Sequence, residues 1–133
     1  MTRREEGFTL IELLVVIIII GVLAGIAIPT FLRQREKAWR TQAVNDMKNA
    51  ATALESWAVD FGGDFSGANG STDLDPALVD NGYRSNVLVD VIVVSTPSEY
   101  CIRGMHARIP GVEYVFRSGF GVVQVGAPGV IAC

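Results

Sequence analysis

The order of apolar and polar residues divides the chain into an N-terminal apolar run, an amphipathic stretch and a C-terminal part in which the two kinds alternate. The apolar run covers Phe8–Ile28, 21 residues in which only Thr9 and Glu12 carry polar side chains. An α-helix of that length extends about 31 Å, close to the ~30 Å hydrocarbon core of a bilayer. Because charged residues flank the run on both sides, the pattern predicts a helix that can span a membrane.

The amphipathic stretch follows, and its apolar residues recur at steps of three and four. They are Trp39, Ala43, Met47, Ala50, Ala51, Leu54, Trp57, Ala58 and Phe61. Such a stripe predicts a helix with one face against a partner layer. No proline or glycine interrupts residues 30–61, and Gly62-Gly63 comes next. We therefore predict one helix from Phe8 to about Phe61, bent at Pro29.

The next segment, residues 62–86, is rich in glycine, asparagine and aspartate and predicts a loop. Within it we expect one short helix with Asp75 as its N-cap, Pro76 in its first turn and Gly82 at its end. The nearby acids Asp64, Asp73 and Asp75 offer the oxygen ligands that calcium prefers, but their spacing matches no calcium-binding loop. Solvated loop acids are the favoured interpretation.

From Asn86 onward the period of the apolar residues becomes two, which is typical of β-strands. Four strands are predicted: Val87–Val94, Glu99–Arg108, Val112–Arg117 and Val122–Val125. Their short connections indicate an antiparallel meander whose apolar face covers the helix stripe. We expect Ala127–Cys133 to return along the edge of this sheet. The fold class is therefore α+β, a long N-terminal helix packed against a four-stranded antiparallel sheet.

Composition limits what else the chain holds. Without the first 28 residues about a hundred remain, enough for one small domain. The net charge of the chain is −3, and from Gly62 onward four arginines stand against seven acids. This mildly acidic balance argues against nucleic acid as a general ligand.

The two cysteines, Cys101 and Cys133, leave two possibilities open. A bridge between them would tie the C-terminal segment to the second predicted strand and, in the loop-entropy treatment, stabilise the fold by roughly 3–4 kcal/mol. The alternative is a pair of buried free thiols. Their spacing, with a single histidine in the chain, matches no metal site.

No pattern of catalytic residues stands out. His106 is the only histidine, and neither a nucleophile elbow, a phosphate-binding loop nor a carboxylate pair accompanies it. We expect His106 to face solvent from its strand. The sequence therefore predicts no enzymatic activity, no cofactor and no metal centre.

The stretch Gly7-Phe8-Thr9-Leu10-Ile11-Glu12, followed by the apolar run and Pro29, resembles the N-terminus of a type IV prepilin. In that family a short leader ends in glycine, the mature chain begins with an aromatic residue, and its fifth residue is glutamate. The resemblance covers roughly Gly7–Pro29, a fifth of the chain. It implies cleavage between Gly7 and Phe8, N-methylation of Phe8, and a role for Glu12 in assembly.

The same resemblance assigns parts to the chain. Residues 1–7 are the leader, 8–29 the membrane-spanning and polymerising half-helix, and 30–61 the amphipathic half-helix of the head. Residues 62–86 form the αβ loop, and 87–133 the sheet with a C-terminal disulfide loop, a feature that type IV pilins also show. Counting basic residues around the span would place the head in the cytoplasm, whereas the resemblance places it outside.

The predicted function is that of a major pilin, the structural subunit of a homo-oligomeric helical filament. Its partners would be a prepilin peptidase and the pilus assembly machinery. It would lie in the cell membrane as a single-pass prepilin and then enter an extracellular pilus. Glu12 would pair with the Phe8 amine of a neighbouring subunit, since each charge is costly to bury alone. Gly21 and Pro29 mark the softest part of the half-helix, where the family's helix can unwind.

Three alternatives remain. Two come from the same machinery, a minor pilin and a pseudopilin of a type II secretion system. The cysteine pair favours a pilin, because a resemblance to major pseudopilins usually involves a calcium-binding loop and no C-terminal cysteine pair. The third is a single-span membrane anchor that carries a small binding domain, and it predicts no cleavage after Gly7.

Overall fold

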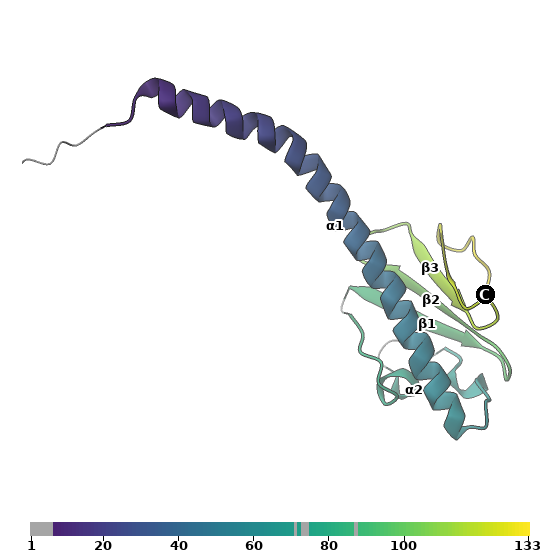
Figure 1. Ribbon diagram of the computed structural model, residues 1–133. Helices are drawn as coiled ribbons and strands as arrows, with labels where there is room; N and C mark the ends of the chain where they lie inside the picture. The colour runs from purple at the N-terminus through teal and green to yellow at the C-terminus, as the bar shows by residue number, and fades with distance from the viewer. Residues whose placement is uncertain (1–6, 71, 73–74, 87) are drawn as a thin grey trace, which may run out of the picture. The chain divides into compact units, whose positions relative to one another are not determined.

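The computed structural model describes residues 7–70, 72, 75–86 and 88–133. Its elements, in chain order, are α1 (Leu10–Asp60), the 3-10 turn η1 (Ser66–Ala68), α2 (Pro76–Val79), β1 (Val89–Ser95), β2 (Tyr100–His106), β3 (Glu113–Arg117) and β4 (Val123–Gly126). Figure 1 shows them along the chain. The chain divides into two compact units, Met1–Glu36 and Lys37–Cys133, and α1 belongs to both. The predicted α+β fold, a long helix packed against a four-stranded antiparallel sheet, is confirmed.

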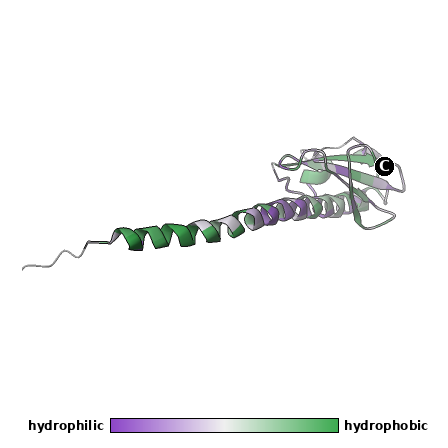
Figure 2. Cartoon of the chain, turned by 90° about the horizontal axis from the view of Figure 1, so that it is seen from above, coloured by the Kyte–Doolittle hydropathy of each residue, from purple (hydrophilic) through white to green (hydrophobic). Residues whose placement is uncertain are grey.

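The first unit consists of the apolar part of α1, and none of its described residues is buried. Large apolar side chains such as Leu10, Ile17 and Ile26 are more than half exposed. An 18-residue window of this helix has a mean hydropathy of 3.0, which makes it long and apolar enough to cross a membrane. Figure 2 shows the change along α1 from a uniformly hydrophobic first part to a mixed second part.

In the second unit, α1 lies across one face of the sheet (Figure 1) and supplies about two fifths of the buried core residues. The buried members of the predicted stripe are Ala43, Met47, Ala50, Ala51, Leu54 and Ala58. At the last position of the stripe the prediction is wrong, because Phe61 is 57% exposed. The helix ends at Asp60, and Phe61 instead stacks on Trp57 with ring centroids 4.4 Å apart.

The sheet is the predicted meander, with strand order β1-β2-β3-β4 and antiparallel pairing throughout. Its inner face meets the helix through Val89, Val91, Val93, Ile102 and Tyr114, all at most 3% exposed. Most strands are shorter than predicted, because residues at their predicted ends belong to turns instead. The Asn86 side chain accepts from the Leu88 amide, and the His106 carbonyl accepts from Ile109. Val87 lies outside the described residues.

The short helix in the loop begins as predicted, but it ends earlier. The Asp75 side chain accepts a hydrogen bond from the Ala77 amide at 3.2 Å, and Pro76 is the first helical residue. The helix ends at Val79 rather than at Gly82. Gly82 has φ +93°, so it turns the chain after the helix in a conformation that suits glycine.

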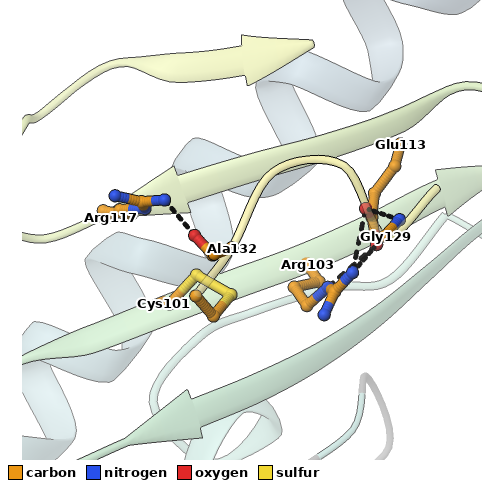
Figure 3. Close-up of polar contacts among 7 residues, drawn as sticks. Cys101, Arg103, Glu113, Arg117, Gly129 and Ala132 are labelled. Carbon is orange, nitrogen blue, oxygen red and sulfur yellow. Dashed lines mark hydrogen bonds and ion pairs between the residues drawn. A yellow bond between two sulfur atoms is a disulfide. The ribbon is translucent and has the colours of Figure 1, made fainter. Parts of the chain in front are cut away.

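The C-terminal segment does not follow the sheet edge, so that prediction is wrong. Cys133 is bonded to Cys101 in the inner strand β2, and the segment therefore crosses the outer face of β3 after leaving β4. Figure 3 shows it passing over the strands. Its path accounts for Val115, which is 0% exposed although it points away from the helix. Below, residues 127–133 are called the tail.

Candidate functional site

The predicted processing site lies in front of the helix. Phe8 is 91% exposed, and a Cβ placed on Gly7 would meet nothing within 4 Å. Both residues precede the first helical residue, Leu10, so this peptide bond lies in open chain. The rest of the predicted leader, residues 1–6, lies outside the described residues.

Glu12 is bound by its own chain. The backbone amide and the hydroxyl of Thr9 each donate to Glu12 Oε2 at 2.8 Å, and the Glu12 amide donates back to Thr9 Oγ1 at 3.3 Å. This reciprocal arrangement is a capping box, which satisfies amides that the first helical turn leaves free. The Thr-x-x-Glu spacing signals it in the sequence, but the sequence analysis assigned Glu12 to assembly alone.

The surface around Glu12 is apolar. A shallow hollow is lined by Phe8, Ile11, Glu12, Leu13, Val15 and Val16, and Glu12 is the one charged side chain in that lining. A hollow with one carboxylate in an apolar wall suits an apolar partner that brings one positive group.

The helix passes through Pro29 without a break. Proline has no amide hydrogen, so the carbonyl of Gly25 lacks its usual donor there. The Thr30 hydroxyl donates to the Ile26 carbonyl at 3.1 Å, a contact that often accompanies helix bending. A Cβ at Gly21 or Gly25 would meet nothing within 4 Å, so close packing inside this chain does not require either glycine.

The structure joins Cys101 to Cys133, with Cα atoms 5.6 Å apart. Two polar contacts hold the tail beside this bridge (Figure 3). Arg103 binds Glu113 through two N–H···O bonds of 2.8 and 3.0 Å, and Glu113 Oε2 also accepts from the Gly129 amide at 2.9 Å. Arg117 donates to the Ala132 carbonyl. The sequence did not predict these contacts of Glu113 and Arg117 with the tail, because they depend on the path of the tail across β3.

His106 does not face solvent, so that prediction is also wrong. It is 1% exposed on the inner face of β2, where its Nε2 lies 3.2 Å from Gln42 Oε1 and its Nδ1 accepts from the Arg108 amide at 3.0 Å. Residues alternate along a strand, and this position falls on the helix side together with Tyr100 and Ile102. Burial lowers the pKa of His106, although the negative charge of Asp46 opposes the shift.

The loop acids act locally where they are described. Asp64 accepts from the Ser66 amide at 2.8 Å, and hydrogen bonds from the side chain and backbone of Ser66 lower its pKa. Asp75 caps α2. The third acid, Asp73, lies outside the described residues. Within the described part of the chain, no three acidic, histidine or cysteine side chains gather as they would around a metal ion.

Comparison with known proteins finds one family match at the N-terminus and several relatives that match part of the chain. The family described as "Prokaryotic N-terminal methylation motif" matches residues 2–28. Type II secretion system core protein G of Pectobacterium carotovorum subsp. carotovorum is 44% identical over 57 residues, 43% of this chain and 36% of that protein. The Escherichia coli K12 protein of the same name is 42% identical over 59 residues, 44% and 41% of the two chains.

A protein with a different name also matches. The type IV major pilin protein PilA of Myxococcus xanthus is 44% identical over 54 residues, 41% of this chain and 24% of that protein. The chain thus spans less than half the length of these curated relatives. A search of solved structures gave no match.

Proposed function

We propose that this type IV pilin-like protein is the major structural subunit of a type IV pilus, assembled after a peptidase removes residues 1–7. One observation carries the proposal: the Gly7–Phe8 cleavage motif stands directly before a helix whose apolar side chains are exposed on every side. Such a helix requires a membrane or other apolar helices around it. A prepilin in a membrane, followed by helices packed in a filament, supplies both in turn.

Assembly would use the capping box. Cleavage turns the Phe8 nitrogen into an amine one residue before Thr9, whose amide and hydroxyl hold Glu12. In an apolar surround, the Glu12 carboxylate and the Phe8 amine of a neighbouring subunit relieve each other's burial cost. Glu12 therefore acts as the register group that stops one helix from sliding along the next. In this account the chain is structural and performs no reaction itself.

The bridged tail supports a pilus over a pseudopilus. The tail is fixed to the sheet by a disulfide and by the Arg103–Glu113–Gly129 contacts. A covalent closure of this kind suits a head outside the cytoplasm, where disulfides persist, and a C-terminal cysteine pair is a feature of pilins that resemblance to major pseudopilins usually lacks. The second candidate is the pseudopilin of a type II secretion system, which the names of most reported relatives favour.

Filament location separates these candidates. The test is to shear cells that express the chain at its native level, and to follow it in the sheared and envelope fractions beside a mutant lacking the gene. A pilin is expected in sheared filaments visible by electron microscopy, and those filaments should vanish from the mutant. Subunits confined to the envelope, together with loss of protein secretion in the mutant, would establish the pseudopilin instead. If only uncleaved monomer is found in both fractions, both filament candidates are excluded and the chain is a membrane-anchored binding domain.

A further inference from the structure

The two cysteines of the Cys101–Cys133 bridge differ in how much of each residue is exposed to solvent. Cys101 is 6% exposed on the outer face of β2, whereas Cys133 is exposed. Both cysteines line a cavity of 280 Å³, together with Glu99, Tyr100, Arg117 and Phe120. The bridge is thus reachable from solvent, but mainly from its Cys133 side.

We propose that this cavity admits an external thiol and that thiol–disulfide exchange begins at Cys133 Sγ. A thiolate must reach the sulfur that it attacks, so burial protects Cys101 whatever the reagent. The reagent that fits the cavity is a thiol on a small or extended molecule. It is either a free thiol peptide such as glutathione or the active-site loop of a dithiol protein. This site lies outside the N-terminal motif, so the inference does not rest on the proposed assembly role.

Arg117 supports this direction of attack. It is the cross-strand partner of Cys101, and directly opposed residues in an antiparallel pair point to the same face. Its guanidinium also donates to the carbonyl of Ala132, next to Cys133 (Figure 3). When the bond breaks by attack on Cys133, the negative charge develops on Cys101. A neighbouring guanidinium stabilises that thiolate.

The exchange balances as follows. The external thiolate bonds to Cys133 Sγ, the bridge breaks, and Cys101 leaves as a thiolate that takes a proton from water. A second external thiol then attacks the mixed disulfide and releases Cys133 as a thiol. The bridge gains two electrons, and the two external thiols become a disulfide. Formation of the bridge is the reverse, in which an external disulfide first captures the exposed Cys133 thiol and Cys101 displaces it.

The experiment locates the mixed disulfide in the full-length protein held in detergent micelles. One arm uses glutathione, and the other uses a thioredoxin whose second active-site cysteine has been replaced by serine so that the adduct is trapped. Samples are quenched with acid over a time series and mapped by peptide mass spectrometry, extrapolating to zero time because a freed Cys101 can attack the adduct. We expect adducts on Cys133 to exceed those on Cys101 by about tenfold or more.

Adducts on Cys133 in either arm support the proposal, and the arm that reacts distinguishes a small thiol from a dithiol protein. Equal labelling, a majority on Cys101, or no adduct in either arm while denatured protein reacts would overturn it. Arg117→Gln should lower the rate at which the Cys101–Cys133 bridge is reduced, whereas Arg117→Lys should keep a rate close to that of the wild type. Arg84→Gln is the control, because Arg84 is remote from the bridge in the sequence. Loss of the contact to Ala132 alone would loosen the tail and speed reduction, so a faster Arg117→Gln variant would refute the supporting role of Arg117.

Discussion

Two carboxylates, Glu12 and Glu113, each accept hydrogen bonds from backbone and side-chain donors. The partners of Glu12 can be predicted from the sequence, whereas those of Glu113 cannot. Glu12 stands out because a charge interrupts an apolar run, and its partner Thr9 lies three residues away at capping-box spacing. Glu113 looks like an ordinary outward strand residue. Its partners Arg103 and Gly129 come from another strand and from the tail, so only the folded chain reveals them.

Replacing Glu12 tests assembly against folding. Glu12→Ala removes the carboxylate that would pair with a neighbouring Phe8 amine, and breaking a buried pair typically costs about 3–5 kcal/mol. The variant should be inserted, cleaved and folded, yet leave its subunits in the membrane. Thr9→Val is the matched control, since it loses the hydroxyl contact but keeps the carboxylate. The measurement is the yield of filaments sheared from cells. If Glu12→Ala gives as many filaments as the wild type at equal expression, Glu12 does not pair with the Phe8 amine in assembly.

Burial of His106 predicts a pH dependence. Its folded pKa lies below its ordinary value of 6.5, because burial disfavours the charged ring and Arg108 adds to the shift. The unfolded chain therefore takes up this proton first, and the free energy of unfolding should fall as the pH drops below about 6.5. Denaturation followed by tryptophan fluorescence in detergent, at a series of pH values, measures this. In His106→Gln the decline just below that pH should disappear.

The buried Asp46, which interacts with His106, should change the stability with pH in the opposite direction. Burial raises its pKa, against the backbone of Asn86 and the charge of His106. The folded chain takes up that proton first, so this group adds stability as the pH falls through its folded pKa. Asp46→Asn should therefore keep the decline below pH 6.5 that His106 causes. A decline that persists unchanged in His106→Gln would show that other groups control it.

At the level of elements, the pattern of apolar residues was sufficient to predict the long helix and the four strands, and the short connections between the strands predicted their order. The pattern failed at the strand ends and at the tail. Strand ends depend on turn hydrogen bonds such as the one from Ile109 to His106. The route of the tail across β3 has no periodic signal, because it depends on a disulfide to an inner strand and on single contacts at Gly129 and Ala132.

The helix and the sheet approach each other closely at Gly104 in β2. A Cβ there would overlap the Met47 methyl group and lie 2.9 Å from its sulfur and 3.0 Å from the Asp90 carbonyl oxygen. Met47 is fully buried, so it has little room to move. Gly104→Ala should lower the free energy of unfolding by about 1–3 kcal/mol. Gly119→Ala, where a Cβ meets nothing within 4 Å, is the control, and equal denaturation midpoints for the two variants would contradict this packing.

The tail is the element that the disulfide fixes. Cys133→Ser should reduce the free energy of unfolding by roughly 3–4 kcal/mol, because the bridge closes a loop with a sequence separation of 32. Limited proteolysis should then cut the tail first and leave β1–β3 intact. Wild-type protein treated with a reductant is the matched comparison and should behave in the same way. An unchanged cleavage pattern in both would mean that the polar contacts to Glu113 and Arg117 hold the tail alone.

At the scale of the whole molecule, the two units present different surfaces. The first exposes an apolar helix with one carboxylate near its start, and the second buries a core of its own between α1 and the sheet. The family model covers residues 2–28, and the matches to relatives cover little more than two fifths of the chain. Residues 29–133 therefore lie outside the match to the family model.

Whether this chain is a processed filament subunit can be measured from the intact mass of the protein purified from its own cell envelope. We expect a chain that begins at Phe8, carries one methyl group on its new amine, and is two hydrogens lighter than the dithiol form because of the Cys101–Cys133 bridge. A mass that still includes residues 1–7, or a cut at any other peptide bond, would contradict this expectation.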